Sequence, residues 1–243
     1  MEDKMISKDE QKVLAARTAV DTLIQEGKIF SGMKIGLGTG STAMPAVKRL
    51  SERIEDGTLR DIRAVATSFQ TTLECERLGI PVYSLNDRVI SGRLDLAIDG
   101  ADEVGPSRTL IKGGGAALLR EKIIAYSSGA FAIVADESKA VGTHGTGFPL
   151  PVEIIPEARV CVVMAMEELG ASCVLREGVR KAGPVITDNG NMILDCLWKS
   201  PVDAAEMEEK INGITGVVEC GFFTKLPPIV FIAKSDGKVE VRR

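Results

Sequence analysis

Short apolar runs alternate with helix-like segments across residues 33–136, and this alternation restricts the folds open to the chain. Strands that alternate with helices are typical of a largely parallel sheet covered on both faces. The sequence therefore predicts an α/β fold. The helix-like segments include 69–78 and 116–127. The strand candidates are MKIGL (33–37), RAVAT (63–67), VYSL (82–85), LDLAID (94–99), TLIK (109–112) and FAIVAD (131–136).

The first helix carries its own start and stop signals. Ser7 and Glu10 have the spacing of a capping box, in which each side chain satisfies the other residue's backbone amide. Apolar residues follow at helical spacing, and Gly27 suits the end of the helix. The sequence thus predicts a helix that begins after Ser7.

The pattern changes after FPLP (148–151). The order becomes strand, helix, strand, strand, helix, strand, which is that of a ferredoxin-like unit. A last strand candidate, IVFIA (229–233), can return to the first sheet and make the small unit an insertion. The predicted domains are therefore 1–149 plus 224–243, and 150–223. The small unit's elements are VEII (152–155), 157–169, CVLRE (173–177), MILDC (192–196), 203–211 and VVECGFF (217–223).

Composition excludes several classes of protein. The net charge is −4, whereas a nucleic-acid binder would show a basic patch or stripe. No apolar run reaches the ~18 residues of a membrane span, and the polar N-terminus has no signal-peptide core. The five cysteines lack a CxxC spacing, so we expect buried free thiols and a cytoplasmic protein. A plastid protein without its transit peptide would look the same.

The chain has one histidine, His144, in the glycine-rich segment GTHGTG. A histidine-rich zinc site is therefore not available. If the chain is an acid–base enzyme, its base is expected to be a carboxylate or a lysine tuned by burial.

The segment GLGTGST (36–42) lies between a predicted strand and a predicted helix. Its glycines let the backbone approach an anion, and the following helix offers free amides. The segment suits a phosphate monoester. Neither the dinucleotide motif, which needs glycine at position 41, nor the P-loop, which needs a preceding lysine, fits. The alternative is an ordinary glycine-rich turn. The candidate binding residues are Thr39, Gly40, Ser41 and Thr42.

Charged residues and glycines follow the next strands. Asp99 and Asp102 flank Gly100 and Ala101 after LDLAID, and ligands of open parallel sheets bind beyond the carboxyl ends of strands. Lys112 ends TLIK and leads into Gly113, Gly114 and Gly115, whose cost in chain entropy suggests either a backbone with positive φ or backbone amides that face a ligand. An acidic surface turn is the alternative for the two aspartates.

Glu121 lies in the helical segment 116–127. Its neighbours one turn away are Ala117, Leu118, Ile124 and Ala125, none of them charged. A carboxylate in an apolar stripe loses hydration, which raises its pKa toward the range useful for a general base. The alternative is a helix glutamate paired with a distant cation. Lys139, after FAIVAD, is a further candidate at the same edge of the sheet, although a loop lysine is more often solvated surface.

These segments closely resemble ribose-5-phosphate isomerase type A. The resemblance rests on GLGTGSTA (36–43), IDGADEV (98–104), IKGGGAALLREKI (111–123), ESKAV (137–141), FPLPVEIIP (148–156), TDNGN (187–191) and 202–223. The spacing between DGADE and KGGGAALLREK is the most specific part of it.

The resemblance implies a Rossmann-like domain with an inserted ferredoxin-like α+β domain, and a homodimer or homotetramer. It implies metal-independent interconversion of D-ribose 5-phosphate and D-ribulose 5-phosphate, so we expect no metal or other cofactor. With the composition, we expect a small-molecule substrate and no nucleic acid or membrane partner. It makes Glu121 the proton acceptor and places Thr39–Thr42, Asp99–Asp102, Lys112–Gly115 and Lys139 in the substrate site. It leaves open whether Lys12 contacts the phosphate.

From these residues we expect a cis-enediolate mechanism, with Asp99, Asp102 and Lys112 assisting Glu121. Three alternatives remain open. The chain could be another sugar-phosphate isomerase or deaminase, a sugar-phosphate sensor, or an enzyme similar to coenzyme A transferases.

Overall fold

The computed structural model describes residues 5–243, and the chain divides into two compact units. The first unit consists of Met1–Ala101, Arg120–Ala140 and Leu226–Arg243. The second consists of Asp102–Leu119 and Val141–Lys225. Segments 102–119, 141–149 and 224–225, which were predicted for the larger domain, therefore group with the smaller one.

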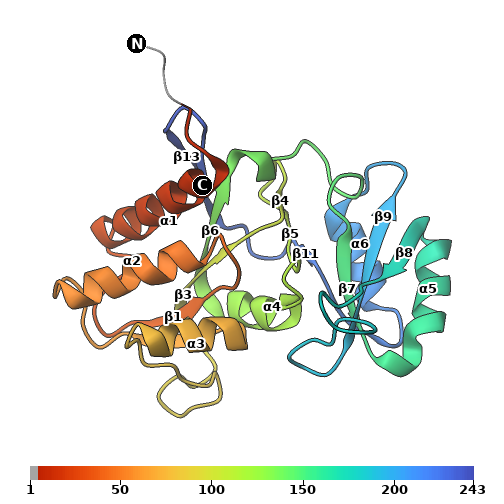
Figure 1. Ribbon diagram of the computed structural model, residues 1–243, viewed down its shortest axis with the longest axis horizontal. Coiled ribbons are helices and arrows are strands. Elements are labelled where there is room, and N and C mark those ends of the chain that lie inside the picture. Colours follow the sequence, from red (N-terminus) through yellow and green to blue (C-terminus); the bar gives the residue numbers. More distant parts are fainter. Residues whose placement is uncertain (1–4) are drawn as a thin grey trace. The chain divides into compact units, whose positions relative to one another are not determined.

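The first unit is built on a six-stranded sheet (Figure 1). All neighbouring strands run parallel except β12 and β13. The five parallel strands are arranged 2-1-3-4-5 in chain order, which is a doubly wound order. The predicted Rossmann-like sheet is thus confirmed. Across the sheet the strands are β13 (Val239–Arg242), β12 (Ile229–Ala233), β6 (Ser128–Asp136), β3 (Leu94–Gly100), β1 (Lys34–Leu37) and β2 (Arg63–Ala66).

Helices α1 (Lys8–Gln25), α2 (Met44–Glu55), α3 (Phe69–Arg77) and most of α4 (Leu118–Tyr126) belong to this unit. The predicted capping box at the start of α1 is present in both directions, between Ser7 and Glu10. α1 lies beside α2 and packs on β6 and β12 (Figure 1). The core between helices and sheet is aliphatic and includes Leu23, Ile35, Leu37, Leu50 and Val134.

One predicted strand of this region, VYSL, is not formed, and another, TLIK, joins a different sheet. In VYSL only Val82 forms a bridge, to Ala64, because the chain turns at once: the Ser84 amide donates to Asp87 and the Asp87 amide to the Ser84 carbonyl. The segment TLIK does form a strand, but this strand, β5 (Leu110–Ile111), belongs to the second unit. It pairs antiparallel with β4 (Glu103–Val104) and β11 (Phe222–Phe223) in a separate sheet.

The second unit contains the predicted ferredoxin-like order. A four-stranded sheet has the order β10-β7-β9-β8 with every pair antiparallel. The apolar side chains of α5, α6 and one face of this sheet share one core, so both helices cover the same face. The chain order is β7 (Leu150–Ile154), η2 (Pro156–Ala158), α5 (Arg159–Glu168), β8 (Ala171–Leu175), β9 (Met192–Trp198), α6 (Ala204–Asn212) and β10 (Val217–Cys220).

The predicted strand VVECGFF (217–223) is divided at Gly221. A Cβ at Gly221 would lie 2.4 Å from the Lys112 carbonyl oxygen, so the backbones approach closely there, and Phe222–Phe223 leaves to pair with β5. IVFIA forms β12 and pairs with β6, so the chain returns to the first sheet after the ferredoxin-like unit. This unit is therefore an insertion between two strands of the first sheet.

Three of the five cysteines, Cys75, Cys196 and Cys220, are buried free thiols as expected. Cys173 is partly buried and Cys161 is exposed. Burial raises the pKa of the Cys75 thiol to about 11. Between residues 5 and 243, no helix combines the length and the hydropathy that crossing a membrane requires.

Candidate active-site elements

The order of the parallel strands reverses between β1 and β3. The chain leaves β1 toward β2 on one side, and leaves β3 toward β6 on the other. At such a switch point the two following loops diverge, and ligands of doubly wound sheets bind beyond the carboxyl ends of these strands. Gly38–Thr42 follows β1, and Asp99 and Gly100 end β3. Two of the predicted site segments therefore lie at this position of the first unit.

Asp99 is fixed against the loop that follows β1. Its side chain is almost fully buried, and its Oδ1 accepts hydrogen bonds from the backbone amides of Thr39 (3.2 Å) and Gly100 (2.7 Å). Gly38 makes this approach possible, because a Cβ there would lie 1.9 Å from the same oxygen. The carboxylate is thus held by backbone donors at the edge of the sheet.

The Thr39 hydroxyl enters a cluster of hydroxyl groups supplied by the end of β2 and the start of α3. Its Oγ1 lies 2.6 Å from the hydroxyl oxygens of Thr67 and Ser68, and 3.2 Å from that of Thr71. The Thr71 hydroxyl also donates to the Gly38 carbonyl (2.8 Å). Thr67, Ser68 and Thr71 are buried and were not predicted as site residues, although Thr67 ends the predicted strand RAVAT and SFQTT (68–72) directly follows it. They fix the position of the glycine loop.

The rest of the loop leads directly into α2. Gly40 has φ +90° and its amide donates to the Gln70 side chain (3.2 Å). Ser41 is exposed and Thr42 is partly buried. Ala43 gives α2 no side-chain cap, and the amides of Met44 and Ala46 donate to the backbone carbonyls of Gly40 (3.1 Å) and Ala43 (2.9 Å).

Glu121 is buried, with only 5% of its surface exposed. Ala117, Leu118, Ile124 and Ala125, its neighbours on the apolar stripe, are buried as well, whereas Ile123 is 46% exposed. The sequence left open which face of this helix meets the interior, and the structure identifies it as the face that carries Glu121.

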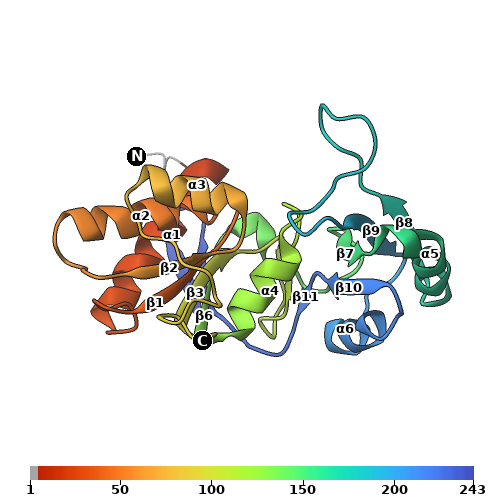
Figure 2. The same ribbon diagram turned by 90° about the horizontal axis from the view of Figure 1, so that it is seen from below.

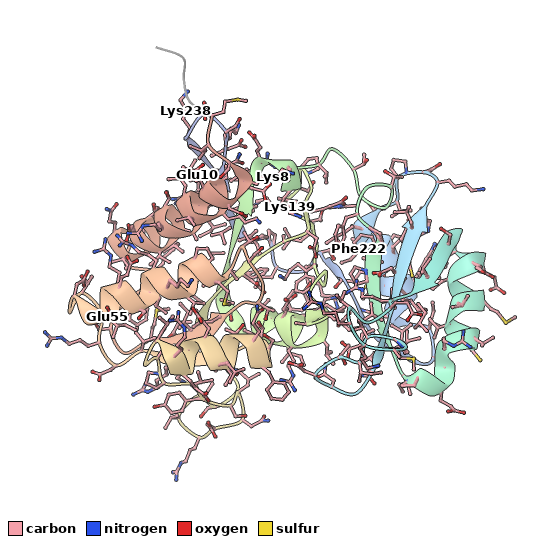
Figure 3. The ribbon with its side chains drawn as sticks, in the orientation of Figure 1. Lys8, Glu10, Glu55, Lys139, Phe222 and Lys238 are labelled. Carbon is pink, nitrogen blue, oxygen red and sulfur yellow. The ribbon has the colours of Figure 1, made fainter. Side chains whose placement is uncertain are left out.

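Lys139 lies in the short helix η1 (Glu137–Lys139) after β6 and is partly buried. η1 lies beside the first turn of α1, where Gln11 and Glu137 exchange hydrogen bonds of 3.2 and 3.5 Å (Figure 3). The predicted position of Lys139 beyond the carboxyl end of a parallel strand is therefore correct.

The second unit holds the other predicted residues. Asp102 Oδ2 accepts a hydrogen bond from the Gly114 amide (2.8 Å), which joins the DGAD and KGGG segments. Lys112 is buried, and its Nζ lies 5.6 Å from the centre of the Phe223 ring. Gly113 has φ +104°, a conformation that favours glycine, and Gly114 and Gly115 are exposed. The glycine run thus forms a tight, accessible turn beside an aspartate and a lysine.

His144 is part of a buried network in the second unit. Its Nδ1 lies 2.9 Å from Glu103 Oε2, and its Nε2 lies 3.0 Å from the Thr109 hydroxyl oxygen. The ring also meets Phe222 edge-on, with the ring centres 6.1 Å apart. These contacts give the histidine a structural role. In the described part of the chain, no three His, Cys, Asp or Glu residues are grouped as metal ligands.

Comparison with protein families matches residues 63–237 to the family described as ribose 5-phosphate isomerase A (phosphoriboisomerase A). The chain is 61% identical over 231 residues to ribose-5-phosphate isomerase A of Treponema denticola, a match that covers 94% of this chain and 97% of the relative. The protein of the same name from Treponema pallidum subsp. pallidum is 54% identical, over 96% of this chain and 92% of the relative.

Solved structures give the same result for the fold. Ribose 5-phosphate isomerase A from Methanocaldococcus jannaschii superimposes with a TM-score of 0.88 at 41% identity, and the match covers 98% of this chain and 100% of that one. A D-ribose-5-phosphate isomerase in complex with phospho-erythronic acid gives a TM-score of 0.90 at 40% identity, with the same coverage.

The fold, the glycine loop at the strand switch and these relatives define an enzyme of the aldose–ketose isomerase class. The match extends over nearly the whole chain and is close. The chain belongs to the ribose-5-phosphate isomerase A family, and this membership supports isomerisation of ribose 5-phosphate in the pentose phosphate pathway.

Proposed function

We propose that this protein interconverts D-ribose 5-phosphate and D-ribulose 5-phosphate through a cis-enediolate, with Glu121 as the general base and without a metal. Glu121 takes the proton from C2 of the open-chain aldose and returns it to C1. Electrons from the broken C2–H bond form the C1–C2 double bond of the enediolate, while O1 gains negative charge. Return of the proton to C1 gives the ketose.

The observation that carries this proposal is the burial of Glu121 on the apolar stripe of α4. A carboxylate that burial removes from water is poorly hydrated, which strengthens it as a base. Glutamates on exposed helix faces do not have this environment.

Lys112 and the two aspartates support the proton transfer in this proposal. The Lys112 ammonium stabilises the negative charge that develops on the enediolate oxygens, where electrostatic help is most effective. Asp99 and Asp102 hold sugar hydroxyls, assist ring opening and move the proton between O1 and O2. Backbone donors already fix both carboxylates, which supports a positioning role.

The glycine loop is the proposed phosphate site. Thr39, Gly40, Ser41 and Thr42 directly precede α2, and the positive end of a helix dipole favours an anion at this position. Lys139 adds a positive charge. Remote binding of the phosphate would orient the reacting carbons. The relative solved with phospho-erythronic acid, a phosphorylated sugar acid by its name, supports a substrate of this type.

We also propose a homodimer or homotetramer in the cytoplasm. The family resemblance supports the oligomer, and free thiols at all five cysteines suit a reducing compartment.

The test is conversion of ribose 5-phosphate in deuterated water with EDTA, followed by NMR, for the wild type and Glu121→Gln. The wild type is expected to form ribulose 5-phosphate with deuterium at C1. Glu121→Gln keeps the side-chain shape and removes the base, so kcat is expected to fall by about 10²- to 10⁴-fold. Glu168→Gln, an exposed glutamate of α5, is the matched control and should retain activity.

Each part of the proposal can fail separately. Near-wild-type turnover of Glu121→Gln would remove Glu121 as the base. Absence of product with EDTA, or an absolute requirement for added metal, would contradict the metal-independent reaction. A covalent glutamyl thioester with coenzyme A would favour a transferase instead.

A further inference from the structure

The glycine run after β5 is held from two opposite sides. On one side the Gly114 amide donates to Asp102 (2.8 Å). On the other side Arg176 Nη1 donates to the carbonyl oxygens of Gly113 (2.9 Å) and Gly114 (3.2 Å). Arg176 directly follows β8, at the start of the long connection 176–191 to β9 (Figure 2). Arg176 is thus far in sequence from the segment that it contacts.

Asp195 fixes the guanidinium group of Arg176. Its two carboxylate oxygens accept from Arg176 Nε (2.9 Å) and Nη2 (2.5 Å), a two-point contact that sets both position and plane. The side chains are only 15% and 25% exposed. Nη1 is the guanidinium nitrogen that this pair leaves available, and it is the one that reaches both glycine carbonyls.

Because the peptide unit is planar, the hydrogen bonds from Arg176 to the two carbonyls also fix the direction of the N–H groups that follow them. In a trans peptide unit the C=O and the following N–H point in opposite directions. The Gly113 carbonyl faces Arg176, so the Gly114 N–H points away from it, and this N–H meets Asp102. The Gly114 carbonyl also faces Arg176, so the exposed Gly115 N–H is directed away from it as well.

We propose that Arg176, held by Asp195, is a positioning residue that sets the Gly114 and Gly115 amides and, through Gly114, the Asp102 carboxylate for the substrate. The inference rests on the proposed function, in which Asp102 and the glycine run bind the sugar phosphate. A run of three glycines has many accessible conformations, and two bonds from a single fixed cation restrict this run to one of them.

Lysine cannot replace arginine in this role. A guanidinium group has five donors in a rigid plane and can bind a carboxylate with one edge while a further nitrogen reaches the carbonyls. A lysine ammonium keeps the positive charge but cannot reproduce this geometry. The Arg176→Lys variant therefore tests whether the orientation of the loop, and not only the positive charge, is needed.

The experiment combines kinetics with amide exchange in Arg176→Lys, Arg176→Ala and Asp195→Asn. We expect kcat for ribose 5-phosphate to fall by about 10- to 100-fold in Arg176→Lys, since small displacements of binding groups have effects of this size. In the absence of substrate, the backbone amides of residues 111–116 should exchange hydrogen for deuterium faster in Arg176→Lys than in the wild type. Added guanidinium ion should restore part of the kcat of Arg176→Ala, and methylammonium should not.

Arg77→Ala is the matched control. Arg77 makes the same two-point contact with Glu74, at 2.9 and 2.7 Å, at the exposed end of α3. This variant should change neither kcat nor exchange in 111–116. If Arg176 were merely structural, its variants would have a lower melting temperature but the wild-type kcat, and added guanidinium ion would not change the kcat of Arg176→Ala. This result would overturn the inference.

The two proposals fail in different ways. If the wild type does not isomerise ribose 5-phosphate, the proposed function fails, whereas faster exchange in 111–116 of Arg176→Lys would still show that Arg176 orders the loop. If the wild type is active and Arg176→Lys keeps wild-type kcat and exchange, the positioning role is wrong and the proposed function stands.

Discussion

At Gly38 the chain passes so close to Asp99 that no side chain fits between them. A Cβ would lie 1.9 Å from the Asp99 carboxylate oxygen and 2.7 Å from its Cα. The second of these atoms belongs to the backbone of β3 and cannot rotate away. The absence of a single methyl group at position 38 therefore sets both the path of the glycine loop and the orientation of the carboxylate.

Gly38→Ala is expected to lower stability by about 1–3 kcal/mol, the usual range for overpacking a well-packed site. Activity should fall further than the folded fraction accounts for, because Asp99 must move. Urea unfolding and kcat/KM measure the two effects. Gly142→Ala is the control, since a Cβ there meets nothing within 4 Å, and it should leave both quantities unchanged. Wild-type kcat/KM in Gly38→Ala would contradict this view of Asp99.

Among the elements, helix α3 has an N-cap residue, Ser68, that also contacts the glycine loop. Ser68 is the N-cap of α3, where its hydroxyl accepts from the Thr71 amide (3.2 Å). The same hydroxyl accepts from the Thr39 hydroxyl (2.6 Å). Ser7 caps α1 in a similar way through Glu10, but it has no such contact with a loop of the proposed site. The two serines therefore form a natural comparison.

Ser68→Ala and Ser7→Ala should each lower stability by about 1 kcal/mol, the usual effect of removing an N-cap hydroxyl. Only Ser68→Ala should also raise the KM for ribose 5-phosphate, because Thr39 loses a partner next to the proposed phosphate site. Thermal unfolding and initial rates measure the two effects. Equal KM values in both variants would mean that the hydroxyl cluster does not support substrate binding.

The sequence predicted the elements that depend on neighbouring residues, but it did not predict which distant segments pair with each other. The capping box at Ser7 and the ferredoxin-like order depend on neighbouring residues, and both are confirmed. TLIK was predicted as part of the main sheet, because a short apolar run does not reveal that its partners are β4 and β11.

The same limit applies to the site. Asp99, Asp102, Lys112 and Glu121 could be found because each one ends a strand or interrupts an apolar stripe. Arg176 could not be found in this way, since its partner Gly113 lies 63 residues earlier and both ends of the contact are ordinary loop positions in the sequence. Ser68 and Thr71 escaped notice for a similar reason: their contacts with Thr39 depend on the packing of α3 beside β1.

For the whole molecule, the order of segments along the chain determines how the first sheet is completed. β12 pairs with β6 on one side and with β13 on the other, and β13 is the antiparallel edge strand. Charged residues are frequent in β13, as expected of a strand that protects a sheet edge from other chains. β12 itself is apolar and mostly buried.

Removal of residues 238–243 is expected to expose the backbone edge of β12. The shortened protein should have a lower melting temperature and should form higher-mass species in size-exclusion chromatography, because unpaired apolar edges associate. Val241→Thr retains the strand, changes a partly exposed side chain and serves as the control. A shortened protein with the wild-type elution volume and melting temperature would show that β13 has no protective role.

The insertion of the second unit also has a consequence for synthesis on the ribosome, which releases a chain from its N-terminus. Every residue of the second unit precedes Leu226, whereas β12 and β13 follow it. The ferredoxin-like unit can therefore finish folding while β6 still has one open edge. The unit that begins first in the chain is completed last, and a chaperone that protects the nascent protein would be needed longest at the β6 edge.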